Sequence, residues 1–220
     1  MNQKFSDIYK ESIEKPEIFW KKISEDIFWY KKPSKILNKS NPPFYKWYED
    51  GVTNTCYNAV DIHIEKGLGE KTALIYDSPI TGSKRKITYL ELKNSTAKFA
   101  GALKNQGINK GDRVIIYMPM IPEAVIAMLA CGRIGAVHSV VFGGFAPNEL
   151  ASRIDDSKAK IIVTASCGFE PGRTIEYKPL VDKAIELSKH KPEKIILYQR
   201  KGNEVKLNNS TEISWEDSIK

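Results

Sequence analysis

Residues 113–144 read RVIIYMPMIPEAVIAMLACGRIGAVHSVVFGG, and this stretch decides the fold class. Near its two ends lie the short, continuous apolar runs VIIYM and SVVF, and Pro122 opens an apolar helix between them. Apolar runs without polar alternation are typical of strands buried on both faces of a parallel sheet. The order strand, helix, strand therefore predicts an α/β unit.

The same alternation continues on both sides of this stretch. Upstream, TALIYDSP predicts a strand and KITYLELKNSTAKFAGALKNQGI a helix; downstream, KIIVTAS and EKIILYQR predict strands, with helices at PNELASRIDD and IEYKPLVDKAIELSKH. We expect an α/β fold, the N-terminal part of a doubly wound and mostly parallel sheet. The last residues, WEDSIK, predict a helix that has just begun, and we expect further chain to complete the sheet.

Residues 1–66 have a different composition from the rest. They are rich in Trp, Tyr, Phe and Lys and poor in Val and Leu. Helices are expected near residues 7–13, from Pro16 onward and over residues 58–66, with irregular structure at NPPFYKWYEDG between them. We predict an aromatic-rich extension over residues 1–66 and the α/β domain over residues 67–220. The aromatic side chains of the extension are expected to pack against one another rather than to stack on nucleic-acid bases.

Composition excludes several classes of protein. The 220 residues are 41% hydrophobic and 28% charged, the balance of a globular protein. The net charge of +7 comes from lysines scattered among acids, so no nucleic-acid partner is expected. The sequence has no signal peptide and no run of about 18 apolar residues, which indicates a cytoplasmic protein without a membrane partner. Cys56, Cys131 and Cys167 lie far apart and are expected to be reduced thiols.

Short motifs exclude some chemistries as well. The stretch GLGEKT at residues 67–72 lacks the glycine that a Walker A loop needs directly before its lysine. HExxH and GxSxG are absent, and the three histidines have no metal or triad spacing. The sequence therefore indicates no catalytic residue and no metal ligand.

One loop with the features of a ligand site follows the second strand of the deciding stretch. In VFGGFAPNEL, residues 141–150, Gly143 and Gly144 permit a tight turn and a close approach to a ligand, and Pro147 begins the next helix. A ligand at the carboxyl ends of parallel strands would lie there, where a helix N-terminus favours negative charge. A plain strand-to-helix turn explains the same residues equally well.

The second such loop is SCGFEPGRTIEYK, residues 166–178, predicted to connect a buried strand to a helix. Gly172 shapes the turn, and the planar guanidinium of Arg173 can bind a phosphate. The alternative is a structural arginine paired with Glu170 or Glu176. Two successive loops of this kind favour a shared phosphate-bearing ligand but indicate no reaction.

Over residues 112–166, the sequence resembles the N-terminal domain of AMP-forming short-chain acyl-CoA synthetases. These are the acetyl-CoA and propionyl-CoA synthetases of the adenylate-forming superfamily. Residues 47–76, WYEDGVTNTCYNAVDIHIEKGLGEKTALIY, resemble the segment before the core of these enzymes. Residues 9–29, YKESIEKPEIFWKKISEDIFW, are similar to their N-terminal extension.

The resemblance implies an acid:CoA ligase. A short carboxylic acid attacks ATP to give an acyl-adenylate and pyrophosphate with the help of Mg2+, and the coenzyme A thiol then displaces AMP. The partners are therefore small molecules. By position, the resemblance places Phe142, Gly143 and Gly144 at the adenine of coenzyme A, and Gly172 and Arg173 at its phosphates.

Two departures from the family pattern qualify this expectation. Acetyl-specific members tend to carry a basic loop such as Arg-Gly-Gly-Arg, whereas this chain has Glu170-Pro171-Gly172-Arg173, a form closer to the propionyl branch, which favours propionate over acetate. The family's phosphate loop, later ATP motifs, acyl pocket and C-terminal domain are expected beyond Lys220, together with the ATP and Mg2+ sites. We expect the 220 residues alone to be inactive; a non-catalytic module that binds coenzyme A or a nucleotide is the alternative.

Overall fold

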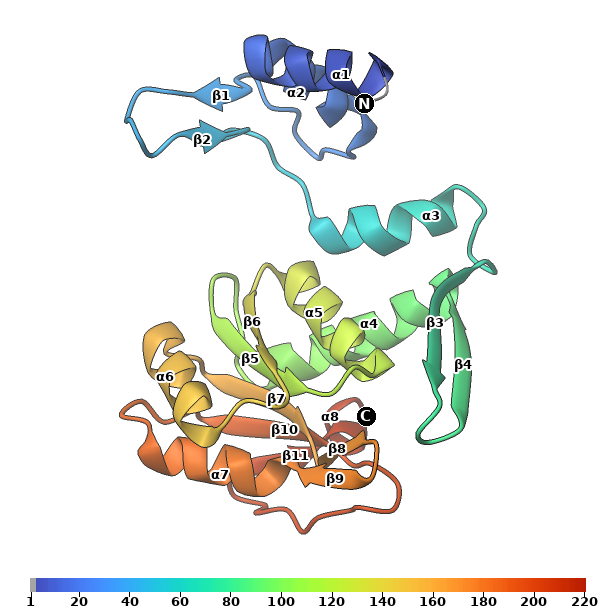
Figure 1. The fold of residues 1–220 in the computed structure, drawn as a ribbon, viewed down its shortest axis with the longest axis vertical. Coiled ribbons are helices and arrows are strands. Elements are labelled where there is room, and N and C mark those ends of the chain that lie inside the picture. The colour runs from blue at the N-terminus through green and yellow to red at the C-terminus, as the bar shows by residue number, and fades with distance from the viewer. Residues whose placement is uncertain (1–2) are drawn as a thin grey trace. The chain divides into compact units, whose positions relative to one another are not determined.

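The computed structural model describes residues 3–220, which form two compact units (Figure 1). The first unit ends at Asn54. It contains α1 (Gln3–Glu14), α2 (Pro16–Ile23), a 3-10 turn (Ser24–Asp26) and the short antiparallel pair β1 (Leu37–Asn38) and β2 (Lys46–Trp47). Pro16 occupies the first turn of α2, as the sequence predicts, because its missing N–H has no helical partner at that position.

Aromatic side chains pack on one another in the first unit. The rings of Trp20 and Trp47 meet edge to face with centroids 6.0 Å apart, and those of Trp29 and Tyr48 lie 5.5 Å apart. The Tyr48 hydroxyl also donates a hydrogen bond of 2.9 Å to the Trp20 carbonyl oxygen. These contacts agree with the expected packing role of the aromatic residues.

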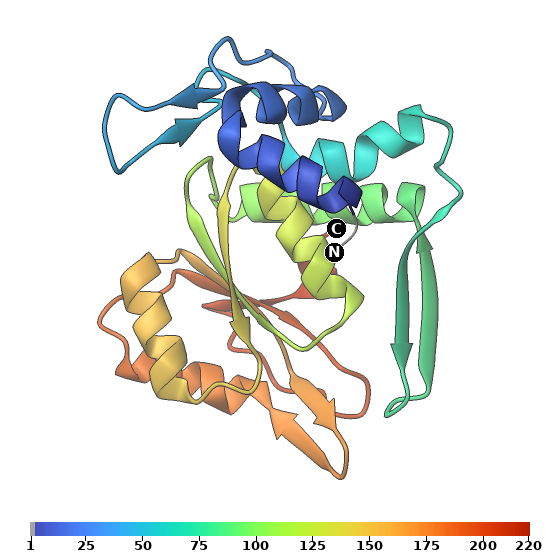
Figure 2. The same cartoon turned by 45° about the horizontal axis from the view of Figure 1, so that its top comes forward.

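The second unit, Thr55–Lys220, is built on a five-stranded parallel sheet (Figure 2). The strand order is β11-β10-β7-β5-β6, and every neighbouring pair is parallel. The strands are β5 (Arg113–Met118), β6 (Val137–Phe142), β7 (Ile161–Ala165), β10 (Lys194–Tyr198) and β11 (Glu212–Ser214). The predicted parallel α/β fold is confirmed.

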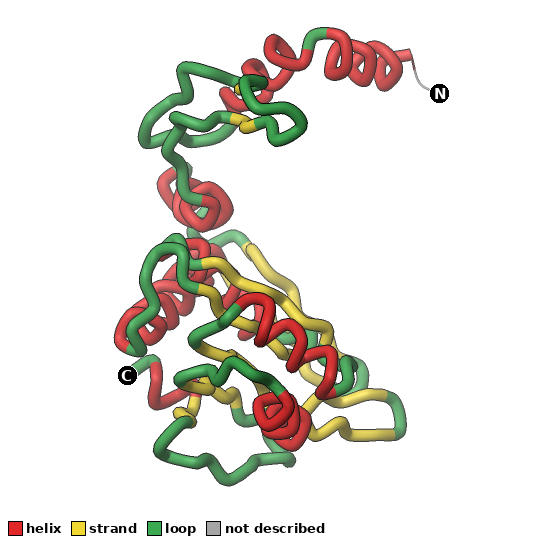
Figure 3. The backbone as a smooth tube through the Cα atoms, turned by 90° about the vertical axis from the view of Figure 1, so that its left-hand side faces the viewer, coloured by secondary structure: helices red, strands yellow, loops and turns green. Residues whose placement is uncertain are grey.

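Helices cover both faces of this sheet. They are α4 (Tyr89–Asn105), α5 (Pro122–Ile134), α6 (Pro147–Ser157), α7 (Tyr177–Leu187) and the short α8 (Trp215–Ser218). Figure 3 shows the helices around the strands of the sheet. Val114 and Ile116 pack with α4, α5 and α8, whereas Ile115 and Tyr117, one residue out of phase, pack with α6 and α7. All four side chains are buried, which explains why β5 is apolar without alternation.

The direction in which successive strands are added to the sheet reverses at β5. β6 lies on one side of β5, and the next sheet strand, β7, lies on the other. Such a reversal separates the connections that leave two adjacent strands and opens a crevice outside their carboxyl ends. The sheet therefore offers a ligand site beside Met118, at the end of β5.

Residues 166–178 differ from the prediction of a loop. They contain an antiparallel hairpin, β8 (Cys167–Glu170) and β9 (Arg173–Glu176), in which Glu170 pairs with Arg173. Pro171 and Gly172 make the turn: proline fixes its own φ, and Gly172 has φ +74°, the combination that a type II turn requires. The strands have only four residues each, too few for a periodic pattern in the sequence.

A second hairpin joins β3 (Thr72–Ser78) to β4 (Ser83–Thr88). The sequence pattern predicts that the end of β4 belongs to the following helix, but that helix, α4, begins only at Tyr89. The Thr88 side chain accepts a hydrogen bond from the Glu91 N–H, and the Glu91 carboxylate accepts one from the Thr88 N–H. This capping box sets the helix start.

The helix that the sequence predicts over residues 58–66 is present as a π-helical turn (Tyr57–Asp61) continued by α3 (Ile62–Glu65). It belongs to the second unit. Val60 is buried in the core with residues of α4 and α5, and the Asp61 carboxylate accepts a hydrogen bond of 2.5 Å from Arg133 of α5.

Candidate functional site

A cavity of about 510 Å3 lies at the carboxyl ends of the sheet strands, where the direction of the chain reverses. Its walls include the ends of β3 and β5, the end of β6 with its glycine pair, and the β8–β9 hairpin. The lining is mostly apolar, with Met118, Met120, Val140, Phe142, Phe169 and the two glycines among its residues. Apolar lining with few polar groups is typical of a site for a small organic ligand.

The glycine pair of the first predicted loop lines this cavity, but one of the two glycines is required for another reason. A Cβ on Gly143 would lie 2.1 Å from the Tyr177 hydroxyl oxygen, and a Cβ on Gly168 would lie 2.7 Å from the same atom. The buried Tyr177 side chain thus lies against the backbone of two separate segments. The close approach at Gly143 is made by Tyr177 of α7 and does not by itself indicate a ligand.

The Tyr117 side chain contacts the glycine loop through hydrogen bonds. Its hydroxyl lies 3.0 Å from the Phe145 carbonyl oxygen and 3.4 Å from that of Gly143, and it can donate to either. Burial raises the pKa of Tyr117, and it raises that of Tyr177 to about 12, so both phenols stay protonated at neutral pH. The Tyr117 hydroxyl thus connects the end of β5 to the glycine loop.

Phe142 stands at the edge of this cavity. Its side chain is 68% exposed although it follows the buried Val141, and its ring meets that of Phe145 edge to face at 5.8 Å. An exposed aromatic ring beside an apolar cavity can stack on a flat ligand. Phe142, Gly143 and Gly144 are therefore brought together on the cavity wall.

Gly172 and Arg173, the predicted phosphate contacts, lie elsewhere. Gly172 lies in the turn of the β8–β9 hairpin, and Arg173 is the first residue of β9. Neither residue lines the cavity. Arg173 donates from Nη2 and Nε to one Glu170 carboxylate oxygen, at 2.6 and 2.8 Å. This geometry is that of a structural arginine paired with Glu170, the alternative to a phosphate contact.

The sequence analysis missed Arg200. It follows β10, lines the cavity and holds its guanidinium carbon 4.8 Å from the centroid of the Phe169 ring. Its backbone N–H donates a hydrogen bond of 2.9 Å to Ser166 Oγ, at the end of β7. The available signal was a cation two residues after the run KIILY, at the same edge of the sheet as both loops.

Neither a metal cluster nor a membrane span is found in the part of the chain that the structure describes. Over residues 3–220 no group of three or more His, Cys, Asp or Glu residues could hold a metal ion. No helix within the same range is long and apolar enough to cross a membrane. Cys56, Cys131 and Cys167 are free and buried, in agreement with the predicted thiols.

Comparison with known families places the chain. A family described as "AMP-binding enzyme" matches residues 63–218, and one described as "Acetyl-coenzyme A synthetase N-terminus" matches residues 5–59. The chain therefore belongs to the AMP-binding enzyme family. The second match covers the first compact unit from residue 5 to its end at Asn54.

Individual relatives narrow the resemblance to the short-chain acyl-CoA synthetases. The rat protein "Acyl-CoA synthetase short-chain family member 3, mitochondrial" is 50% identical over 94% of this chain and 31% of its own length. "Acetyl-coenzyme A synthetase" of Streptomyces coelicolor is 44% identical over 91% of this chain and 31% of its own length. The chain thus spans about a third of the length of the curated relatives it matches, and the predicted family is confirmed.

A solved structure supports the fold independently. "Acetoacetyl-CoA Synthetase from Streptomyces lividans" superposes with a TM-score of 0.84, covering 96% of this chain and 32% of that one. The sequence identity is 22%. At this identity the likeness confirms the fold class and nothing finer.

Proposed function

We propose that this chain is the N-terminal region of an AMP-forming short-chain acyl-CoA synthetase. The proposed reaction joins a short carboxylic acid to the α-phosphate of ATP and releases pyrophosphate. The coenzyme A sulfur then attacks the acyl carbon, AMP leaves, and a thioester forms. The observation that carries the proposal is the 50% identity to the rat relative over 94% of the chain.

We place the adenine of coenzyme A against Phe142, Gly143 and Gly144. Support comes from the exposed Phe142 ring and the apolar cavity beside it, which suit a flat base. The phosphates are assigned to Gly172 and Arg173, on an exposed hairpin turn. Glu170 competes for the same guanidinium, so phosphate binding there requires Arg173 to leave its present partner.

We assign the ATP and Mg2+ sites to sequence beyond Lys220. A developing phosphate charge needs cations or fixed donors placed around it, and a magnesium ion needs oxygen ligands. The carboxylates of residues 3–220 form no cluster that could supply those ligands. We therefore expect the 220-residue chain to catalyse no adenylation by itself.

Two finer assignments complete the proposal. Propionate is preferred over acetate, because the turn Glu170-Pro171-Gly172-Arg173 resembles the propionyl branch. A cytoplasmic location is supported by three free thiols, which suit a reducing compartment. Cell fractionation with an antibody against residues 1–66 tests the location; the protein in a mitochondrial fraction would contradict it.

The function is tested on the native product. The same antibody captures the protein from its source cells, its intact mass is measured, and acid-dependent exchange of pyrophosphate into ATP is assayed with propionate and acetate. We expect a species well above 24.9 kDa that exchanges pyrophosphate and forms an acyl-CoA when coenzyme A is added. A captured protein that exchanges pyrophosphate with neither acid would refute the proposal.

A non-catalytic module that binds coenzyme A is the second candidate. It is favoured by the mostly apolar cavity at the carboxyl ends of the strands, whose lining lies entirely within residues 76–200. Calorimetry on the 220-residue chain with coenzyme A and with dephospho-coenzyme A tests it. Binding of coenzyme A by a native product of 24.9 kDa without exchange activity would favour this candidate over the ligase.

A further inference from the structure

A second cavity, of about 350 Å3, lies next to the first and differs from it in charge. Its walls come from the β3–β4 hairpin, the start of α5 and the residues that follow β10. It is lined by three cations, Arg85, Arg200 and Lys201, and by one carboxylate, that of Glu123. The two cavities share Arg200 and Phe169, so the Arg200 side chain faces both.

One of the three cations already has a partner. Arg85 Nη1 lies 2.9 Å from the Glu123 carboxylate, whose side chain is only 8% exposed. By contrast, Arg200 and Lys201 form no ion pair with any carboxylate within residues 3–220. The only carboxylate in this lining is thus paired with Arg85, and Arg200 and Lys201 carry positive charges without an ion-pair partner among the described residues, although Asp77 and Glu170 line the larger cavity that Arg200 also lines.

Arg200 is also held in place. Its backbone N–H donates a hydrogen bond to the hydroxyl oxygen of Ser166, which is fully buried. The backbone N–H of Ser166 in turn donates a hydrogen bond of 2.9 Å to the Tyr198 carbonyl oxygen. The guanidinium carbon lies 4.8 Å from the Phe169 ring centroid, a cation–π contact. A fixed guanidinium loses little freedom when it binds an anion.

We propose that this cavity binds a phosphate group through Arg200 and Lys201. A guanidinium can donate two parallel hydrogen bonds to phosphate oxygens, and the lysine adds a point charge. The hydroxyls of Ser83 and Tyr198 line the same cavity and can donate to further oxygens. This phosphate site is separate from the Arg173 turn and does not require ligase activity in the chain.

The shared wall defines what the rest of the ligand can be. A molecule with its phosphate at Arg200 can extend past Phe169 into the larger, mostly apolar cavity. The phosphate can therefore belong to a nucleotide such as coenzyme A or be a free inorganic anion. Both sources present the same chemistry to Arg200, and separate titrations distinguish them.

The test is calorimetric titration of the 220-residue chain with pyrophosphate at constant ionic strength. We expect saturable binding that weakens about tenfold or more in Arg200→Gln and less in Lys201→Gln, because only arginine provides the bidentate fork. Arg153→Gln is the matched control. Arg153 also lies over a phenylalanine ring, 5.5 Å from the Phe145 centroid, but lines neither cavity. Circular dichroism confirms that each variant is folded.

Further titrations with coenzyme A, dephospho-coenzyme A and pantetheine identify the source. If Arg200→Gln weakens coenzyme A but not dephospho-coenzyme A, the bound group is the 3′-phosphate; equal weakening of both, with pantetheine unaffected, identifies the diphosphate. If Arg200→Gln weakens the binding of pyrophosphate but of neither coenzyme A nor dephospho-coenzyme A, the bound group is a free anion. The proposal is overturned if Arg153→Gln weakens binding as much as Arg200→Gln, or if the wild-type chain binds none of these anions. Neither result bears on pyrophosphate exchange by the native product, so the two proposals fail separately.

Discussion

The Arg173 guanidinium is bound to the carboxylate of Glu170 across the two-residue turn of the β8–β9 hairpin, with Nη2 2.6 Å and Nε 2.8 Å from the same oxygen. The pair is solvent-exposed: the side chains are 69% and 40% exposed. Exposed ion pairs contribute little to stability, about 0–1 kcal/mol. The consequence of this pair is therefore functional, because it occupies the cation assigned to the coenzyme A phosphates.

Replacing Glu170 by glutamine is expected to strengthen coenzyme A binding. The substitution removes the competing charge and leaves Arg173 available, a gain of up to about fivefold if the pair contributes ~1 kcal/mol. Calorimetry on the 220-residue chain measures it. Dephospho-coenzyme A is the control ligand and should gain less. An unchanged affinity in Glu170→Gln would remove Arg173 from the proposed site.

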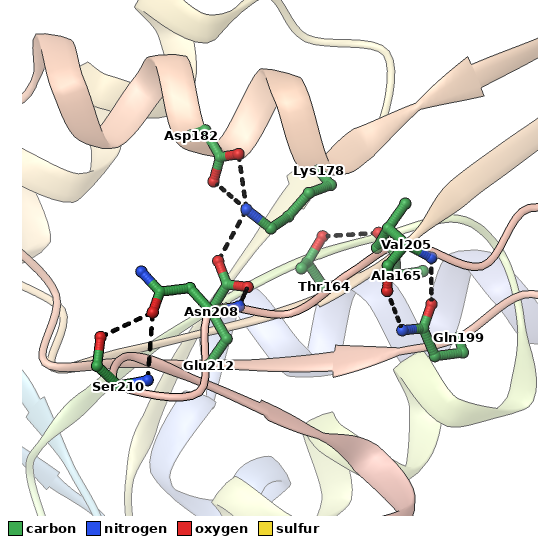
Figure 4. A network of polar contacts seen from close by, with 9 residues as sticks. All are labelled: Thr164, Ala165, Lys178, Asp182, Gln199, Val205, Asn208, Ser210 and Glu212. Atoms are coloured by element: carbon green, nitrogen blue, oxygen red, sulfur yellow. Dashed lines mark hydrogen bonds and ion pairs between the residues drawn. The ribbon is translucent and has the colours of Figure 1, made fainter.

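Lys178→Met is expected to destabilise the second unit by about 3 kcal/mol, because it leaves a buried carboxylate without its cation. Lys178 Nζ lies 2.8 Å from Glu212, whose side chain is 3% exposed, and 2.6 Å from Asp182 (Figure 4). Urea unfolding measures the loss. Lys183→Met is the matched control: its pair with Glu186 is exposed, and a change within about 0.5 kcal/mol is expected. Equal effects would contradict the role of burial.

The contribution of Lys178 should also depend on pH. Burial lowers its pKa, but hydrogen bonds with Asp182 and Glu212 outweigh burial, and the pKa lies above its ordinary value. A raised pKa means that folding favours the charged form, so the contribution is complete below about pH 10.4 and is lost as pH rises through the folded-state pKa. The stability difference between wild type and Lys178→Met should be constant from pH 7 to about pH 10 and shrink as the pH rises through the folded-state pKa. A difference that grows with pH would contradict this sign.

Gly143→Ala is expected to cost about 1–3 kcal/mol, because the new methyl group overlaps the Tyr177 hydroxyl and Gly168 limits movement of the ring. Adding Tyr177→Phe removes the closest atom and should recover part of the loss. Gly101→Ala is the control. Gly101 is in the interior of α4 with no atom within 4 Å of its added Cβ, so a gain of about 0.5–1 kcal/mol is expected. Thermal unfolding compares the stability of the two Gly143→Ala variants and Gly101→Ala. An unchanged stability in Gly143→Ala would show that the glycine loop can move to accommodate the methyl group.

The three thiols should be unreactive in the folded chain. Cys56, Cys131 and Cys167 are at most 1% exposed, and burial raises the pKa of each, that of Cys131 to about 12. Because the thiolate is the nucleophile, a disulfide reagent at pH 8 should label the native chain slowly and all three thiols after unfolding in urea. Rapid labelling of any thiol in the native chain would show local opening around it.

The sheet was predictable from the sequence because its signals are local. The apolar runs of β5, β6, β7 and β10 are short and continuous, and Pro122 fixes the start of α5. The position of the glycine pair after β6 was predictable for the same reason, because it follows from the end of a strand. The β8–β9 hairpin was not, since four-residue strands carry no period and Pro171-Gly172 fits a loop equally well.

The alternation of strands and helices and the parallel sheet were predictable from the amino-acid order, because each follows from residues near one another in the chain. The tertiary structure alone decided that Tyr177 lies against Gly143 and Gly168, and that Arg200 lies over Phe169 between two cavities. These contacts join segments that lie on different strands and helices. Their geometry is set by the order of strands in the sheet, which no local pattern of residues encodes.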